Sequence, residues 1–315
     1  MVSGNYNYQF IDWSHDAIPN SENGPPGDDH AHLGTMSTHL ITPTVTLGLS
    51  DYLNITFQQA VGIRSMDWMG EGDSNHHRDE HSLSDFLDQA NGSIFGDATI
   101  NLKYLLTNTG MLAGSRIFIG GGLIIPSNSV LKKSPFIDEN ADDVVDDKHR
   151  HFSMSDGCYK TNFELQYYIK RNAKNWFEPS FYGITFNYIR PYEASKYGYL
   201  PGNTYISVGS ILFATKLKNT WAPKGVSLGV AFLKANEASW DNDPAPNSKT
   251  EVFIPSLGMI WNHKKYGSLS LNIKYNLNEA FAEDGGNDLN NESQSIELSI
   301  GYRKTLNYTI PWLYY

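Results

Sequence analysis

The sequence contains no long run of apolar residues. None of its 315 residues lie in an apolar stretch of about 18 residues, which excludes a membrane-spanning helix. The first residues, MVSGNYNYQF, have neither the charged nor the apolar part of a signal peptide, so we expect a mature chain if the protein is exported. The mean hydropathy of −0.41 is typical of soluble proteins, but membrane barrels give similar values because half of each strand is polar.

Cysteine and positive charge are also scarce. Cys158 is the only cysteine, which excludes an intrachain disulfide and a thiolate zinc cluster. The formal net charge is −10. Because binding to nucleic acid requires clustered Lys and Arg, we expect no nucleic-acid partner.

Alternation of apolar and polar residues is the dominant pattern of the sequence. Residues 268–277, SLSLNIKYNL, place every leucine, isoleucine and tyrosine on one face and every serine, asparagine and lysine on the other. Strict period two predicts a β-strand, and no comparable helical period of helix length occurs. Similar alternation predicts twelve strands, at residues 5–13, 33–49, 52–68, 96–107, 116–127, 152–171, 176–192, 204–217, 225–240, 251–263, 267–282 and 294–306.

The connections between these strands alternate in length. The short ones are residues 50–51, 108–115, 173–175, 218–224 and 263–267, and the longer ones are 14–32, 69–95, 128–151, 193–203, 241–250 and 283–293. An antiparallel barrel with tight periplasmic turns and long extracellular loops gives this pattern. We therefore predict an all-β fold: one domain, residues 1–315, forming a twelve-stranded up-and-down transmembrane β-barrel in the lipid bilayer of a bacterial outer membrane.

In such a barrel the apolar faces meet lipid and the polar faces line a narrow, wet lumen. The prediction places aromatic girdles near the strand ends, at Tyr52, Trp176, Trp221, Trp261, Tyr266 and Tyr302. Twelve strands lie between the filled barrels of eight and the open pores of sixteen. The predicted lumen residues carry mixed charge, which favours a selective channel for a small solute or, alternatively, charges that pair and plug the barrel: Lys103, Glu164, Lys170, Asn272, Lys274, Glu297 and Arg303.

Three segments carry a resemblance to a known family. Residues 38–62, THLITPTVTLGLSDYLNITFQQAVG, resemble a strand–turn–strand unit of outer-membrane channels. Residues 116–128, RIFIGGGLIIPSN, resemble the glycine-rich strand of the family of transporters of the phenol meta-degradation pathway, and SIELSIGYRKTL (295–306) resembles a closing barrel strand. The resemblance implies passive uptake of small, often aromatic or apolar, compounds, and it implies no catalytic residue.

The first three long connections concentrate potential metal ligands. They hold eight of the ten histidines, and we expect the loops to be neighbours at one rim. Imidazole and carboxylate suit Zn or Cu, and carboxylate alone suits Ca, so a divalent metal could bind there although no cofactor is required. Alternatively, the loops form an acidic, solvated rim. The candidate ligands are His30, His32, His76, His77, Asp79, His81, His149 and His151.

An enzymatic function has little support in the sequence. A barrel hydrolase would need a Ser–His pair, and no spacing ties His39 or His263 to a serine. We therefore expect no catalytic residue and place His39 in the lumen or at the rim. Two functions stay open: a channel for passive uptake of a small solute, or a surface barrel whose loops bind a metal ion or a protein partner, at the rim or at the periplasmic face.

Overall fold

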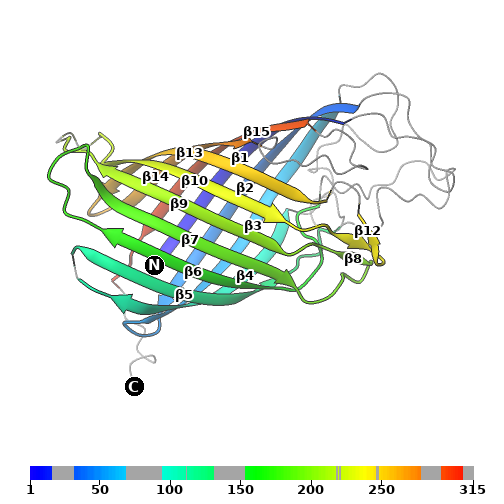
Figure 1. Cartoon of the computed structure of the whole chain (residues 1–315), viewed down its shortest axis with the longest axis horizontal. Helices are drawn as coiled ribbons and strands as arrows, with labels where there is room; N and C mark the ends of the chain where they lie inside the picture. The colour runs from blue at the N-terminus through cyan, green and yellow to red at the C-terminus, as the bar shows by residue number, and fades with distance from the viewer. Residues whose placement is uncertain are drawn as a thin grey trace.

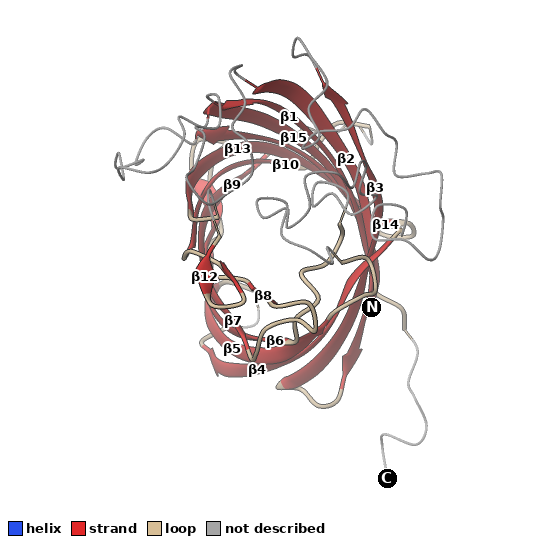
Figure 2. Ribbon diagram, turned by 90° about the vertical axis from the view of Figure 1, so that its right-hand side faces the viewer, coloured by secondary structure: helices blue, strands red, loops and turns tan. Residues whose placement is uncertain are grey.

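The computed structural model describes residues 1–15, 32–68, 94–110, 112–130, 153–217, 219, 221–245, 248–277 and 292–307. Within these residues, twelve antiparallel strands close into a barrel (Figures 1 and 2), which confirms the predicted fold. The barrel strands are β1 (Val2–His15), β2 (His32–Gly48), β3 (Leu53–Trp68), β4 (Phe95–Asn108), β5 (Gly114–Ile125), β6 (Lys160–Lys170), β7 (Pro179–Pro191), β9 (Thr204–Ala214), β10 (Gly225–Ala235), β13 (Thr250–His263), β14 (Gly267–Leu277) and β15 (Glu292–Lys304).

The described part of the chain includes no helix that is long and apolar enough to cross a membrane.

The first and last strands close the ring. Val2–Ser14 of β1 pair with Glu292–Lys304 of β15 in a continuous antiparallel register. The other edge of β1 pairs with β2, and the terminal ammonium group of Met1 donates to the carbonyl oxygen of Thr46 over 2.7 Å. The described barrel therefore has no free strand edge, as a sheet that crosses a bilayer requires.

Connections alternate in length as predicted. Residues 49–52, 109–113, 171–178, 215–224 and 264–266 make the short connections at one end, on the left of Figure 1. The opposite end carries the longer ones, between β1 and β2, β3 and β4, β5 and β6, β7 and β9, β10 and β13, and β14 and β15. By the usual orientation of outer-membrane barrels, the short-turn end is periplasmic and the long-loop end is extracellular.

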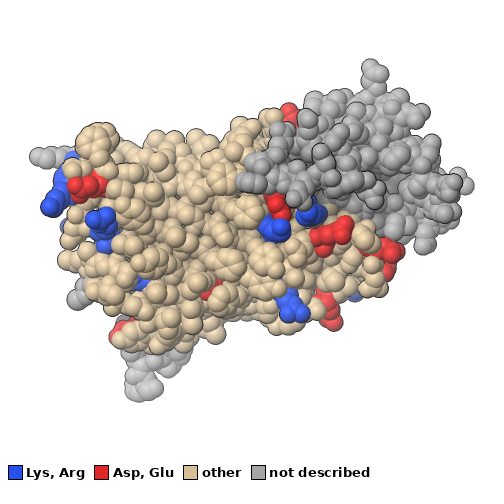
Figure 3. All heavy atoms as spheres, in the orientation of Figure 1, with Lys and Arg blue, Asp and Glu red and all other residues tan. Residues whose placement is uncertain are grey.

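Large apolar side chains cover the outside of the barrel. Ile184 is 61% exposed, and Leu228 and Ile273 are both 50% exposed, although these residues occupy the middle parts of their strands. Figure 3 shows a wall that is mostly uncharged in its middle, with Lys, Arg, Asp and Glu gathered toward the two ends. Such exposure would be unfavourable in water and is what a lipid-facing band requires.

Aromatic side chains mark the periplasmic end of this band. The exposed residues Tyr52, Trp176, Trp221 and Tyr266 all lie in or beside the short turns. Two of the polar groups there are satisfied within the girdle. Trp261 Nε1 donates to the carbonyl oxygen of Trp221 over 3.0 Å, and the Tyr302 hydroxyl donates to that of Tyr266 over 2.6 Å.

His39 faces outward, which corrects its predicted place in the lumen or at the rim. It shares the outer face of β2 with Ile41 and Val45, which are 53% and 43% exposed. Its Nδ1 atom is hydrogen-bonded to the Tyr6 hydroxyl at 2.8 Å, and its ring lies 4.9 Å from that of Tyr8. The hydrogen bond to Tyr6 and the ring contact with Tyr8 reduce the cost of placing this imidazole on the outer face.

The outer face changes character just beyond His39. The next outward positions on β2 are Ser37 and Thr35, and they pair with Ser65 and Asp67 of β3. The Ser37 and Ser65 hydroxyl groups are hydrogen-bonded at 2.7 Å. His39 and its tyrosines therefore mark the extracellular boundary of the apolar band, and β1–β3 continue beyond it.

Two of the predicted strands are much shorter than expected. The strand predicted at 152–171 begins at Lys160, and the one predicted at 225–240 leaves the barrel after Ala235. Beyond it, β11 (Ser239–Trp240) pairs with β8 (Tyr199–Leu200) and β12 (Asp243–Pro244) in a small sheet at the extracellular end (Figure 1). Trp240 is only 4% exposed there and packs against Ala238, Ala245 and the Tyr199 ring.

Candidate functional site: the barrel lumen

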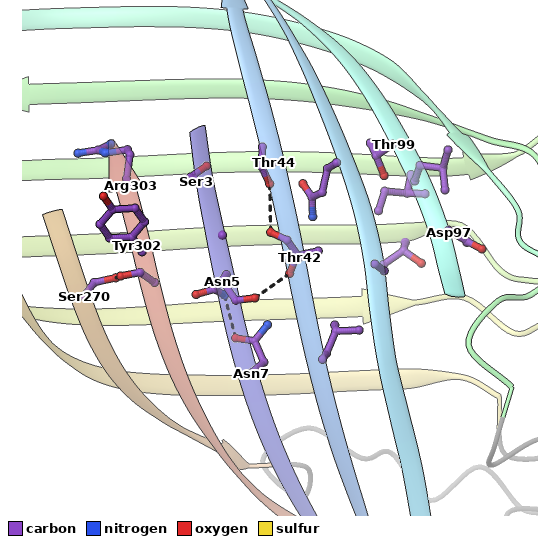
Figure 4. A pocket seen from close by; sticks show the side chains of 18 of the residues that line it. Ser3, Asn5, Asn7, Thr42, Thr44, Asp97, Thr99, Ser270, Tyr302 and Arg303 are labelled. Carbon is purple, nitrogen blue, oxygen red and sulfur yellow. Dashed lines mark hydrogen bonds between the residues drawn. The ribbon is translucent and has the colours of Figure 1, made fainter. Parts of the chain in front are cut away.

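Hydroxyl and amide side chains line much of the lumen wall formed by β1 to β4, β14 and β15. Many of them border a cavity of about 800 Å³ (Figure 4). Asn5 and Asn7 follow one another on the inner face of β1, and the Asn5 amide donates to Asn7 Oδ1 over 2.8 Å. The Thr42 hydroxyl donates to the Asn5 carbonyl oxygen over 3.4 Å. This wall presents neutral donors and acceptors to whatever fills the lumen.

A lysine of β4 reaches across a whole strand to a glutamate of β6. Lys103 Nζ lies 3.0 Å from Glu164 Oε2, although β5 runs between the two strands. Gly120 is the β5 residue in register with both. A Cβ atom at Gly120 would come 3.0 Å from the Leu102 carbonyl oxygen and 3.2 Å from Glu164 Oε2. Because glycine has no side chain, the space above Gly120 stays open, and the lysine reaches the carboxylate through it.

A second ion pair lies on the other side of the ring. Lys274 of β14 and Glu297 of β15 are opposite one another in register, with Nζ 2.8 Å from Oε1, and the Ser299 hydroxyl donates to the same oxygen over 2.8 Å. β14 and β5 are six strands apart in either direction around the barrel. Both ion pairs leave their part of the wall without net charge, while each partly exposed pair adds only about 0–1 kcal/mol of stability.

The structure places the seven predicted lumen residues in four different settings. Four of them form the two ion pairs. Asn272 lies over Gly258, where a Cβ atom would meet the asparagine amide. Arg303 borders the cavity, and Lys170 is exposed at the end of β6 on the same face as Glu164. That these residues line a conducting path stays a prediction.

Three neighbouring strands, β9, β10 and β13, carry aliphatic side chains on both faces, and the sequence analysis did not single out those that face the lumen. The outward-facing side chains show which face is which. Ile211 of β9, Leu228 of β10 and Leu257 of β13 form one register row, and all three are exposed on the outside of the barrel. Because side chains alternate in direction along a strand, the residues between these positions face the lumen. On these strands both faces are apolar, so alternation of residue type alone could not separate them.

The inward-facing aliphatic residues form two adjacent register rows. We call this set the aliphatic wall: Ile206, Leu233 and Val252 in one row, and Val208, Ala231 and Ile254 in the next. The first row continues through Asn187 of β7 to Glu164 of β6. On β13, Ser256 follows on the same face and pairs with Lys274. The aliphatic wall is therefore bordered by an ion pair on each side.

Cys158 lies two residues before β6 at the extracellular end and is almost completely buried, at 1% exposure. Its thiol donates to the carbonyl oxygen of Tyr199 over 3.3 Å. Burial, together with the nearby carboxylate of Asp156, raises the pKa of this thiol to about 11. The pKa and the burial both oppose formation of a reactive thiolate.

We expect Cys158 of the folded protein to react very slowly with maleimide from pH 7 to pH 9. The reason is that the thiolate is the attacking species and the thiol stays protonated over this range. The measurement is the labelling rate of native protein in detergent, with urea-unfolded protein as the reference. Equal rates in the two states would contradict the buried placement.

The predicted metal ligands lie outside the residues whose side chains the structure describes. His32 begins β2, but nothing is described of its side chain, and the others fall in residues 16–31, 69–93 and 131–152. Among the described residues, no group of three or more His, Cys, Asp or Glu side chains could hold a metal ion. The loop metal site stays a prediction.

Comparison with known proteins gives a match of fold. The crystal structure of the COG4313 outer membrane channel from Pseudomonas putida F1 superposes with a TM-score of 0.56, covering 96% of this chain and 94% of that chain at 12% sequence identity. This chain has the fold of an outer-membrane β-barrel. Together with the exposed apolar band, this places it in the outer membrane, as predicted.

More distant likenesses add no detail. The transport unit of the autotransporter AIDA-I from Escherichia coli covers 96% of this chain and 90% of its own at 8% identity and a TM-score of 0.46. The Pseudomonas putida toluene transporter TodX covers 96% and 88% at 9% identity and a TM-score of 0.42. No protein-family model matches the sequence, and no curated protein does either.

Proposed function

We propose that this protein is a passive outer-membrane channel for a small, neutral solute with an apolar body. The observation that carries the proposal is the aliphatic wall, which faces the lumen from β9, β10 and β13. A channel for ions or sugars alone gains nothing from a contiguous set of aliphatic side chains directed into its lumen. An apolar solute gains about 25 cal/mol for each Å² of surface that it buries.

The two ion pairs of the lumen support a neutral solute. Lys103 and Glu164 neutralise one another, as do Lys274 and Glu297. A solute with an apolar body and a hydrogen-bonding group can therefore contact the aliphatic wall while its polar group meets the hydroxyl and amide side chains. Conduction also requires that the solute leave again, so weak contacts suit this role better than a tight pocket.

Single-channel recording in planar bilayers tests the proposal with two neutral probes. Phenyl glucoside and methyl glucoside share a sugar that hinders crossing through lipid and differ in their apolar part. We expect phenyl glucoside to block the potassium chloride current at roughly tenfold lower concentration, since burying about 60 Å² of the phenyl ring contributes about 1.5 kcal/mol. The double variant Ile206→Asn, Leu233→Asn should lose this preference.

Thr44→Asn on the polar wall is the matched control and should keep the preference, because Thr44 borders the cavity away from the aliphatic wall. A wild-type protein that carries no current would contradict the channel function. A current that both glucosides block equally would contradict the apolar solute and leave a general pore.

A further inference from the structure

Residues 153–158, SMSDGC, leave the barrel wall and fold across the extracellular mouth. We call them the mouth segment. At its start, Arg64 of β3 donates from Nη1 to the carbonyl oxygen of Ser153 over 2.7 Å. Arg64 lies between the outward-facing Ile63 and Ser65, so its side chain comes from the inner face of β3. At the end of the segment, the Cys158 thiol donates a hydrogen bond to the carbonyl oxygen of Tyr199, in the connection between β7 and β9. The segment therefore extends from β3 to the β7 side.

The mouth segment is packed like a protein interior. The backbone N–H groups of Met154 and Ser155 both donate to the carbonyl oxygen of Ser129, over 3.1 and 3.0 Å. Ser129 has no exposed surface, and Ser153 and Ser155 are 9% and 8% exposed. A loop that had no defined position would not bury polar residues and pair their backbone groups in this way.

Glycine is required at the bend of the segment. Gly157 has a φ angle of +75°, in the left-handed region that residues with a side chain rarely adopt. A Cβ atom there would also come 3.1 Å from both Ser195 Cβ and Val130 Cγ1. The bend that turns the segment back toward β6 is therefore specified both by backbone conformation and by close packing.

Lys160 ties the middle of the segment to the barrel wall. Its Nζ atom forms an ion pair with Asp156 of the segment and lies 3.8 Å from Asp97 Oδ2 on β4. The Asp97 carboxylate also accepts from the backbone N–H of Ser127 over 3.3 Å. Asp97, Asp156 and Lys160 all border the lumen cavity, so this cluster stands at the entrance to the lumen.

We propose that the mouth segment is a fixed constriction that sets the size limit for solutes entering the lumen, and that Lys160 holds it in place. The inference rests on the proposed function, since a size limit has meaning only for a lumen that conducts. Without the Lys160 charge, Asp97 and Asp156 repel one another. The segment then keeps its hydrogen bonds at Ser153, Met154 and Ser155 but loses the ion pair at Asp156. Movement of this part of the segment outward from the mouth, toward solvent, widens the entrance.

Two measurements on Lys160→Met test this inference. Methionine keeps much of the apolar stem and removes the charge. We expect a larger single-channel conductance and entry of larger polyethylene glycols than in the wild type. Lys264→Met is the matched control, because it makes the same chemical change at an exposed lysine in the short turn between β13 and β14, at the opposite end of the barrel. That control should leave the size limit unchanged.

Labelling of Cys158 provides a readout that does not depend on conduction. If Lys160 holds the segment, Lys160→Met should raise the rate of maleimide labelling at Cys158 roughly tenfold or more, since local opening exposes a buried thiol. Lys264→Met should not. The heat-dependent shift in gel mobility of folded barrels shows whether each variant is folded, and Asp156→Asn replaces Lys160→Met if that variant does not fold.

The outcomes separate the two proposals. Faster labelling with a wider size limit supports the inference. Faster labelling with an unchanged limit shows that the segment moves without controlling entry, and unchanged labelling in a folded variant shows that Lys160 does not hold it; either result overturns the inference alone. A wild-type protein without conductance overturns the proposed function.

Discussion

Replacing Ile273 with Arg is expected to destabilise the folded barrel by about 2–4 kcal/mol in lipid vesicles, the range for a cation near the middle of the bilayer. Ile273 is 50% exposed on the outer face of β14 and pairs in register with Leu298 and Leu257, which also face outward. The guanidinium group would have to lie in hydrocarbon or bend toward a distant interface. Urea unfolding of the barrel in vesicles measures the loss.

The neighbouring substitution Asn272→Arg is the matched control. Asn272 faces the lumen and lies over Gly258, which leaves space for a longer side chain to extend into water. We expect this variant to keep most of its stability. Similar losses at both positions would mean that the two faces of β14 have been assigned wrongly, and with them the lumen.

Replacing Gly122 with Val is expected to destabilise the barrel by about 1–3 kcal/mol, the usual cost of inserting atoms into a packed site. Gly122 lies on the inner face of β5, and a Cβ atom there would collide with the Ile100 carbonyl oxygen and the Asn101 side chain. A backbone oxygen cannot rotate away as a side chain can. The same vesicle-based unfolding experiment measures the difference.

Gly121→Val makes the same chemical change one residue earlier, on the outer face. A Cβ atom at Gly121 would meet only the Asn162 carbonyl oxygen, at an ordinary distance of 3.5 Å. Valine suits both a strand and a lipid-facing surface, so this variant should be neutral or slightly more stable. If Gly121→Val were the more damaging of the two, the alternation along β5 would be reversed.

Much of the barrel could be predicted because lipid and water impose opposite requirements on alternate residues. The strand of residues 268–277 shows this most directly, since every apolar residue of SLSLNIKYNL lies on one face. His39 shows how residue chemistry can mislead where position would not. It shares its parity with Ile41 and Val45 and therefore faces lipid, although a histidine alone suggests a polar environment.

The aliphatic wall could not be predicted in this way. Along β9 and β10 both faces carry small or apolar residues, so period two is weak. The inward direction of Ile206 and Leu233 follows only from the exposure of Ile211 and Leu228 on the opposite face of the same strands. The ion pair of Lys103 and Glu164 is similar, because it depends on a glycine of a third strand lying between them.

The mouth segment was assigned to a strand for a related reason. Met154 and Cys158 alternate with polar residues much as barrel residues do, and strand β6 follows directly. What removes the segment from the wall is a set of contacts distant in sequence, such as that of Arg64 with Ser153, which are 89 residues apart. Local pattern carries no information on such a contact.

The seam between β1 and β15 has a consequence for how the barrel forms and persists. Most strands pair with the strand that precedes or follows them in the chain, so hairpins can form early, whereas β1 and β15 lie at opposite ends of the chain. Pairing them closes the longest loop of the chain. This step therefore has the largest loss of chain entropy, and we expect it to be the slowest step of folding. Once the seam is closed, no edge remains from which strands can peel away one by one. The lifetime of the folded protein is then set by the rate at which this one seam opens, so it should outlast conditions in which its equilibrium stability is already low.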